Sequence, residues 1–222
     1  MPAAIAIIAA LPREIAALVR GVAPDPGLVR EGVWLYRVDG GVVVAAGMGA
    51  DRAAIAVAAA WAAGDVGLLV SAGLAGSCGA EARVGSVIEA GVVVDARTGE
   101  RFGAEGVVLA TTETIASVGE KARLREVYGA SIVDMESAAV ARLAEAHGLR
   151  FRAIKGVSDG YEFELSALAM FEGHRGSFRT GAFAAYTAVR PWTWEKAIEL
   201  GRGSAKALAG LEVVLRGVLA EG

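Results

Sequence analysis

The sequence predicts a three-layer α/β/α domain with a central, twisted, mixed β-sheet. Short apolar runs alternate with Ala-rich stretches of helical periodicity along the 222 residues, a pattern typical of strands that helices cover on both faces. Acidic residues or glycines follow several of these runs, at the strand ends where open α/β sheets place ligand-binding groups. Asp39, Gly40 and Gly41 predict a tight hairpin turn, which makes one strand antiparallel and the sheet mixed.

Strands and helices of the first half follow from apolar periodicity and turn residues. The run at residues 3–9 is continuously apolar, as expected of a buried strand, and Pro12 suits the first turn of a following helix. The predicted strands are residues 3–9, 34–38, 42–46, 67–71, 84–88 and 91–94, and the predicted helices are residues 11–19 and 51–63. Residues 73–79 contain Gly73, Gly76 and Gly79 and are expected to form a loop.

The second half continues the alternation and contains one irregular segment. Ser117 and Glu120 have capping-box spacing, which predicts a helix from residue 117 to residue 128. Further strands are predicted at residues 107–109, 132–133 and 151–157. One further helix is predicted to end near residue 147, and another is predicted at residues 194–219. We expect one domain over residues 1–222, with residues 161–189 as a variable lid or insertion. A solvated or subunit-contacting insertion is the alternative.

Composition favours a small-molecule partner over a nucleic acid or a membrane. The formal charge of −3 comes from mixed signs and provides no basic surface for nucleic acid. No charge-free apolar run approaches the ~20 residues of a membrane span. Residues 3–11 are similar to a short signal core but lack a basic leader. Cys78 is the only cysteine, which agrees with a reducing compartment, so a cytoplasmic protein is expected.

Four acidic side chains lie at the ends of predicted strands: Glu14, Asp134, Glu136 and Asp159. Asp134 and Glu136 stand where a strand gives way to a helix, and acids there also complement the positive helix N-terminus, which is a purely structural alternative. No cluster of His or Cys accompanies these carboxylates. Acid–base chemistry and hydroxyl binding are therefore favoured over a transition-metal site, and no metal or cofactor is expected.

Two glycine turns offer backbone N–H groups at predicted strand ends. Gly47, Met48 and Gly49 follow one predicted strand, and Gly73 and Leu74 follow another. Neither turn has the spacing of a Walker loop or a dinucleotide fingerprint. We interpret the first as a candidate loop for a nucleophile or anion and the second as a candidate substrate contact, with simple tight turns as the alternative.

Five short motifs occur in order along the chain. They are IAIIAALPRE at residues 5–14, AAGMG at 45–49, SAGLAG at 71–76, VDMESAAV at 133–140 and IKGVSD at 154–159. In this order they resemble the nucleoside phosphorylase and nucleosidase superfamily, most closely its 5'-methylthioadenosine/S-adenosylhomocysteine nucleosidase branch. The resemblance covers residues 3–160 and, more loosely, the last helix.

The resemblance implies cleavage of an N-glycosidic bond at ribosyl C1′ through an oxocarbenium-like transition state. It assigns protonation of the leaving purine at N7 to Asp159, with Ser158 as an orienting neighbour. It assigns binding of the ribose hydroxyls to Glu136 and positioning of the attacking water to Glu14. The expected reaction is therefore hydrolysis of a purine nucleoside, with adenine as base.

Several positions depart from the pattern that the resemblance implies. Asp134 and Met135 match ribose- and base-contacting positions, but related nucleosidases more often have Glu in place of Asp134. Leu74 stands where they usually have Ser, and Thr114 and Ile115 fall near their purine-stacking Phe. A non-standard pocket for a larger apolar 5′-substituent is expected, shaped by the segment that contains Phe163, Phe171, His174, Arg175 and Phe178.

The choice between water and phosphate as nucleophile depends on a basic residue. Phosphorylases of this superfamily place Arg just before the glycine loop, since phosphate needs a bidentate cation. Ser71 occupies that position, which favours hydrolysis, although Arg52 or Arg83 could reach in from elsewhere. Phosphorolysis and non-catalytic nucleoside binding are the alternatives. The superfamily's assemblies imply a homodimer or a higher homo-oligomer.

Overall fold

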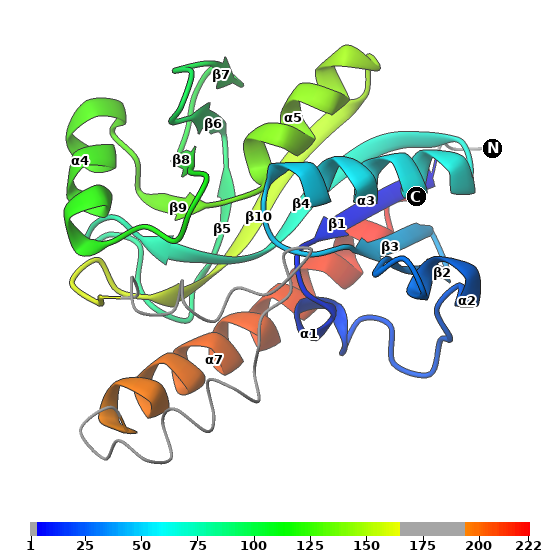
Figure 1. The fold of residues 1–222 in the computed structure, drawn as a ribbon, viewed down its shortest axis with the longest axis horizontal. Coiled ribbons are helices and arrows are strands. Elements are labelled where there is room, and N and C mark those ends of the chain that lie inside the picture. Colours follow the sequence, from blue (N-terminus) through cyan, green and yellow to red (C-terminus); the bar gives the residue numbers. More distant parts are fainter. Residues whose placement is uncertain (1–3, 165–193) are drawn as a thin grey trace.

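The described part of the chain forms a ten-stranded mixed β-sheet with helices on both faces (Figure 1). The computed structural model describes residues 4–164 and 194–222. The helices are α1 (Pro12–Ile15), α2 (Pro26–Val29), α3 (Ala50–Ala63), α4 (Val118–Tyr128), α5 (Ser137–Ala146) and α7 (Trp194–Leu219). α3 and α5 pack on one face of the sheet, and α1 and α7 pack on the other. The predicted α/β fold with a mixed central sheet is therefore confirmed.

β4 is the strand at which the sheet divides. The strands are β1 (Ala4–Ala9), β2 (Trp34–Val38), β3 (Gly41–Ala45), β4 (Val66–Ser77), β5 (Val87–Ala90), β6 (Val92–Asp95), β7 (Arg101–Phe102), β8 (Val108–Thr111), β9 (Ile132–Asp134) and β10 (Arg150–Asp159). The main order is β2-β3-β1-β4-β9-β8-β6-β7, and β10 pairs with β4 and β5. β4 pairs in parallel with β1 and β10, but its last residues pair antiparallel with β9. The ends of β1, β9 and β10 therefore meet beside β4.

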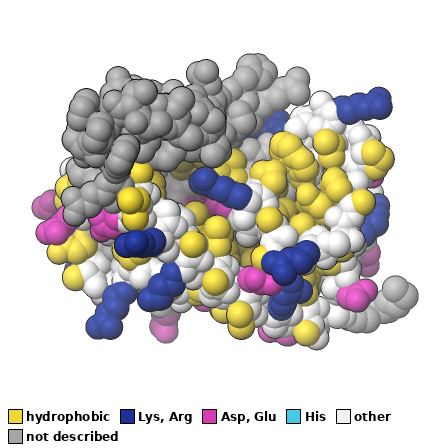
Figure 2. Space-filling view, turned by 90° about the horizontal axis from the view of Figure 1, so that it is seen from below, with side chains coloured by type: hydrophobic (Ala, Val, Ile, Leu, Met, Phe, Trp, Pro, Cys, Tyr) yellow, Lys and Arg dark blue, Asp and Glu magenta, His cyan; other side chains and the backbone are white. Residues whose placement is uncertain are grey.

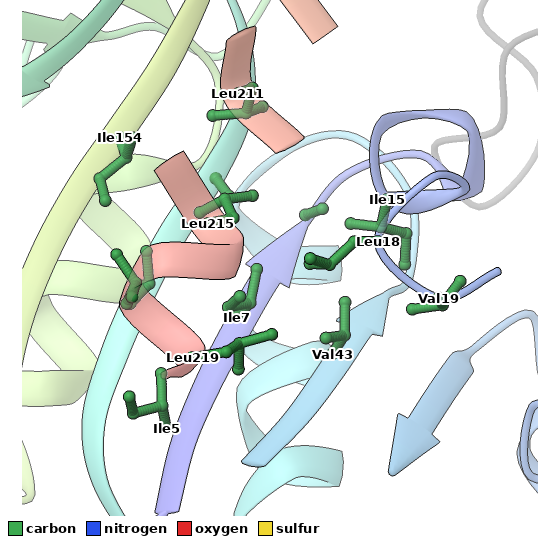
Figure 3. Close-up of a cluster of buried hydrophobic side chains, with 14 of the residues drawn as sticks. Ile5, Ile7, Ile15, Leu18, Val19, Val43, Ile154, Leu211, Leu215 and Leu219 are labelled. Atoms are coloured by element: carbon green, nitrogen blue, oxygen red, sulfur yellow. The ribbon is translucent and has the colours of Figure 1, made fainter. Parts of the chain in front are cut away.

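Two hydrophobic cores explain why β1 is apolar on both faces. Ile5 and Ile7 enter the core under α7, where they meet Leu211 and Leu215 (Figure 3). Ile8 points into the other core, which α3 and α5 cover. Successive side chains of a strand alternate between faces, so a strand between two helical layers needs an unbroken apolar sequence.

Some predicted boundaries are confirmed and others are wrong. The hairpin of β2 and β3 is confirmed, and α7 is continuous despite Gly201, Gly203 and Gly210, because packing rather than propensity holds most protein helices. The helix predicted at residues 11–19 is helical only in α1. Residues 73–79 are not a loop, since β4 continues to Ser77. Backbone pairing with β10 and β9 overrides the glycine signal.

The predicted lid lies mostly outside the described residues. Phe163 is described and is partly buried. Residues 165–189, with Phe171, His174, Arg175 and Phe178, are outside the described part of the chain. The lid and the single domain over residues 1–222 both stay predictions.

The surface carries interspersed charges. Figure 2 shows basic, acidic and hydrophobic side chains mixed over the described part of the face seen from below. Within residues 4–164 and 194–222, no helix is long and apolar enough to cross a bilayer.

Candidate active site

A cavity of about 470 Å³ lies where β1, β9 and β10 end beside β4. Residues 74–76 of β4 border it, and α7 closes one side with small and apolar residues. Predicted site residues that line it are Glu14, Met48, Leu74, Asp134, Met135, Glu136, Ser158 and Asp159. The fold thus brings together acids that are widely separated in the sequence.

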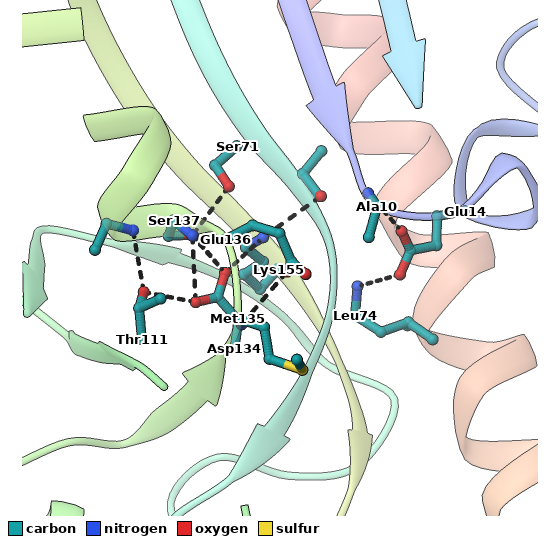
Figure 4. A network of polar contacts seen from close by, with 12 residues as sticks. Ala10, Glu14, Ser71, Leu74, Thr111, Asp134, Met135, Glu136, Ser137 and Lys155 are labelled. Atoms are coloured by element: carbon teal, nitrogen blue, oxygen red, sulfur yellow. Dashed lines mark hydrogen bonds and ion pairs between the residues drawn. The ribbon is translucent and has the colours of Figure 1, made fainter. Parts of the chain in front are cut away.

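Glu14 is held by backbone N–H groups from two parts of the chain (Figure 4). Its Oε2 accepts hydrogen bonds from the Ala10 N–H at 3.1 Å and the Leu11 N–H at 2.9 Å. Its Oε1 accepts one from the Leu74 N–H at 3.1 Å. Gly73 packs against this carboxylate and has a φ of 136°, and a Cβ there would be in tight contact with Oε2 at 3.1 Å. Gly73 lies against Glu14 and does not line the cavity, and its role as a substrate contact stays a prediction.

Glu136 is a buried carboxyl group at the N-cap of α5. Its Oε1 accepts a hydrogen bond from the Gly49 N–H at 2.9 Å, and its Oε2 accepts one from the Met135 N–H at 3.3 Å. Burial, followed by the negative charge of Asp134, raises the pKa of Glu136 to about 7. A group with this pKa changes charge near neutral pH, and its ionised form can accept hydrogen bonds from hydroxyl groups.

Asp134 is enclosed by donors from three other elements (Figure 4). Its Oδ1 accepts from Thr111 Oγ1 at 2.7 Å, and its Oδ2 accepts from Ser137 Oγ at 2.6 Å and pairs with Lys155 Nζ at 2.9 Å. Burial disfavours the Lys155 ammonium group, but Asp134 and Glu136 outweigh that effect and raise its pKa. The Asp134 carboxylate therefore holds the junction of β9 and α5 together, although it borders the cavity.

Asp159 ends β10 and forms an ion pair that the sequence did not predict. Its Oδ1 accepts from Ser158 Oγ at 2.5 Å, and its Oδ2 lies 2.6 Å from Lys121 Nζ. The signal for Lys121 was its helical spacing from Leu124, which is fully buried. This spacing places a cation on the inner face of α4, and a buried cation requires a charged partner.

The turn at residues 47–49 uses its glycine donors within the chain. The Gly47 N–H donates to the Ala10 carbonyl at 2.8 Å, and the Gly49 N–H donates to Glu136. Met48 lines the cavity, whereas Gly47 and Gly49 do not. Both glycine N–H groups of this turn are therefore engaged within the chain, and neither is left to bind an anion.

The basic residues that line the cavity are not Arg52 and Arg83, the two that the sequence indicated. Among the described residues, they are Arg13 and Lys121. Arg52 instead donates to the backbone carbonyls of Ala46 and Gly32, and Arg83 is exposed outside the cavity. The signal for Arg13 was its place beside Glu14 on the first turn after β1.

The described part of the chain contains no group of three or more His, Cys, Asp and Glu side chains suited to holding a metal ion. His147 follows α5 and stacks on Trp61 with ring centroids 4.7 Å apart. His174 lies outside the described residues. The carboxyl groups of the cavity are therefore held by backbone, hydroxyl and ammonium donors.

Comparison with known proteins finds one family model that matches part of the chain. The family model of the phosphorylase superfamily matches residues 96–184, which include β9, α5 and the whole of β10. Over these residues the chain is similar to the phosphorylase superfamily. This match includes Asp134, Glu136 and Asp159. No curated protein sequence matches the chain.

Solved structures share the fold of this chain over nearly its whole length. Helicobacter pylori 5'-methylthioadenosine/S-adenosylhomocysteine nucleosidase with butyl-thio-DADMe-Immucillin-A has 15% identity over 99% of each chain and a TM-score of 0.70. Native futalosine hydrolase of Helicobacter pylori has 15% identity over 99% of this chain and 98% of its own, with a TM-score of 0.68. Arabidopsis thaliana 5'-methylthioadenosine nucleosidase has 18% identity, coverages of 99% and 96%, and a TM-score of 0.71.

Proposed function

We propose that the protein hydrolyses the N-glycosidic bond of a 5′-substituted purine nucleoside and releases the free base and a ribose derivative. One observation carries this proposal: Glu14, Glu136 and Asp159 border one cavity, and each is held by a different set of donors. Glycoside hydrolysis needs an acid at the leaving group, a base at the attacking water and acceptors for the sugar hydroxyls. Three separate carboxyl groups can supply these roles.

In the proposed reaction, Asp159 takes up a proton from solvent and gives it to N7 of the purine while the bond from C1′ to the base breaks and both electrons of that bond leave with the base. Glu136 accepts hydrogen bonds from the ribose hydroxyls and so fixes the sugar. Glu14 accepts a proton from the water molecule whose oxygen attacks C1′. The backbone donors of Glu14 support this role, because they fix the carboxylate without neutralising it.

The proposed substrate has an apolar 5′-substituent and adenine as its base. The cavity volume of about 470 Å³ lies in the range of roughly 300–1,000 Å³ that small-molecule sites occupy. Apart from the polar groups above, its walls are largely apolar, and the larger apolar residues are Leu11, Leu74, Ile115, Leu200 and Leu208. The nucleosidases that share the fold support this proposal, since two of them are named for 5'-methylthioadenosine.

A panel of nucleosides tests the reaction. We expect free adenine to be released from 5′-alkylthio-adenosines at the same rate with and without inorganic phosphate, together with a free reducing sugar. Release of no base from any nucleoside, combined with tight binding of adenine nucleosides, would instead identify a non-catalytic binding protein.

Phosphorolysis is the second candidate, and Arg13 is the observation that favours it. Arg13 lies on the cavity next to Glu14, and an arginine can bind phosphate through two parallel hydrogen bonds. A phosphorylase would depend on phosphate and would form a ribose 1-phosphate derivative. Detection of that product would replace hydrolysis with phosphorolysis.

Substitution of Gly73 by alanine should weaken the proposed water activation. The new Cβ would stand 3.1 Å from Glu14 Oε2, and the backbone has a φ of 136° that L side chains rarely adopt. We expect kcat to fall about tenfold or more, since misplacement of a catalytic group by about 1 Å can cost about 100-fold. Gly64→Ala, at a position with nothing within 4 Å of the new Cβ, is the control and should retain wild-type kcat.

We also propose a homodimer or a higher homo-oligomer in the cytoplasm. On α3, Ile55 is 42% exposed and Trp61 is 46% exposed. Large apolar side chains at the surface are common in subunit contacts. Light scattering of the purified protein measures the number of subunits, and a monomer at all concentrations would contradict the proposal.

A further inference from the structure

Lys121 reaches the cavity from α4 and forms a buried ion pair with Asp159. Its Nζ lies 2.6 Å from Asp159 Oδ2, 2.9 Å from the Gly160 carbonyl oxygen and 3.1 Å from the Phe163 carbonyl oxygen. The Lys121 and Asp159 side chains are each 2% exposed. An ammonium group has three N–H donors, and these three acceptors match them. The contacts therefore fix the position of the Lys121 ammonium group.

β4 leaves space for this ion pair. A Cβ at Gly76 would stand 3.0 Å from Asp159 Oδ2 and 3.2 Å from Lys121 Cε. A larger residue there would displace one of the two side chains. Ser158 binds the other oxygen of Asp159 at 2.5 Å, so each carboxylate oxygen has a defined partner and the orientation of the group is fixed.

We propose that Lys121 is a positioning residue for the proton transfer: it orients Asp159 and stabilises the negative charge that remains when the proton moves to the base. This inference rests on the proposed function, in which Asp159 is the acid. An acid that loses its proton in a buried site leaves an anion there, and a fixed cation at hydrogen-bond distance stabilises that anion in the transition state. Lys121 itself neither gains nor loses a proton in this step.

Other charged groups around Asp159 do not replace Lys121 among the described residues. Burial raises the pKa of Cys78, just beyond β4, to about 12, so its thiol stays neutral. Arg125 of α4 pairs with Glu81 at 2.6 Å on the surface. The α7 residues that border the cavity are uncharged, and the side chains of residues 161 and 162 are exposed.

Replacing Lys121 with methionine removes the charge and keeps an unbranched chain. We expect kcat to fall about 10- to 100-fold, less than loss of the general acid itself would cost, while KM stays within about threefold. A buried carboxyl group without a cation favours its protonated form, so the alkaline limb of the kcat profile should move up by about one pH unit or more. A folded Lys121→Met variant with an unmoved limb, or with kcat within about twofold of wild type, contradicts the proposal.

Arg125→Met is the matched control, because it removes an exposed cation from the same helix. It should change neither kcat nor the pH profile. Lys121→Arg is the second variant, because loss of one partner of a buried pair is destabilising. It keeps the charge, so its alkaline limb should stay at the wild-type position, and a displaced limb contradicts the proposal even if Lys121→Met does not fold.

Wild-type turnover separates the two proposals. If the wild-type protein releases no base from any nucleoside, the proposed hydrolysis fails. If the wild-type protein is active but Lys121→Met behaves like Arg125→Met, hydrolysis stands and only the role of Lys121 fails.

Discussion

Replacing Asp159 with asparagine is expected to lower the kcat of base release by at least about 100-fold, the lower end of what a general acid contributes. Asparagine keeps the size of the side chain but has no acidic proton to give to N7. Its amide oxygen can still accept a hydrogen bond from Lys121 or Ser158, both of which contact Asp159. The fold should therefore persist with lower stability, because breaking this buried ion pair from one side costs about 3–5 kcal/mol. Single-turnover kinetics and circular dichroism of Asp159→Asn measure the two expectations separately.

Asp95→Asn is a matched control for this variant. Asp95 also ends a strand, β6, and also pairs with a cation, Arg142, at 2.7 Å. It does not line the cavity that holds Asp159. We expect its kcat to stay within about threefold of wild type, as for substitutions that do not touch the reacting groups. Near-normal turnover by a folded Asp159→Asn variant would refute the assignment of the acid.

The sequence predicts the fold where local pattern and tertiary packing agree. The apolar run of β1 could be recognised because helices cover both of its faces. The end of β4 could not, because its glycines signal a turn while its backbone pairs with β10 and β9. Those pairings are non-local, so no window around Gly73 contains them.

The acidic residues of the site could be predicted from the sequence, but the donors that contact them could not. Glu14 accepts an N–H three residues away, from Leu11, which is a local contact. Its bond with the Leu74 N–H spans 60 residues, and the pair of Lys121 and Asp159 spans 38. Strand ends reveal where acids gather. Which donor meets each acid depends on how distant elements pack.

Glu136→Gln and Asp134→Asn are expected to have opposite profiles. Glu136 borders the cavity and has only the Gly49 and Met135 N–H groups as hydrogen-bond donors among the described contacts. Glutamine replaces one acceptor oxygen with a donor and removes the charge that holds ribose hydroxyls. We expect kcat/KM to fall about 10- to 100-fold, since a hydrogen bond to a charged group contributes about 1.5–3 kcal/mol.

Asp134→Asn should instead lower stability. The substitution leaves Lys155, which is 1% exposed, without its closest anion at 2.9 Å. Breaking a buried ion pair from one side costs about 3–5 kcal/mol. Chemical denaturation should show this loss, while kcat of the remaining folded protein stays within about tenfold of wild type. Equal and mild losses of kcat/KM in both variants, with equal losses of stability, would mean that both acids serve only the helix N-terminus.

The pH dependence gives the Glu136 prediction its direction. Its pKa rises from the ordinary 4.5 to about 7 because burial and Asp134 disfavour the charged form. An acid whose pKa is raised on folding binds its proton more tightly in the folded state. The stability that this proton contributes is fully present below the unfolded-state pKa and is lost as the pH rises through the folded-state pKa. The free energy of unfolding of Glu136→Gln should therefore increase relative to that of wild type as the pH rises from 4.5 to about 7. The wild-type kcat/KM should fall below about pH 7 as Glu136 becomes protonated, and this limb should be missing in the variant, because glutamine does not titrate.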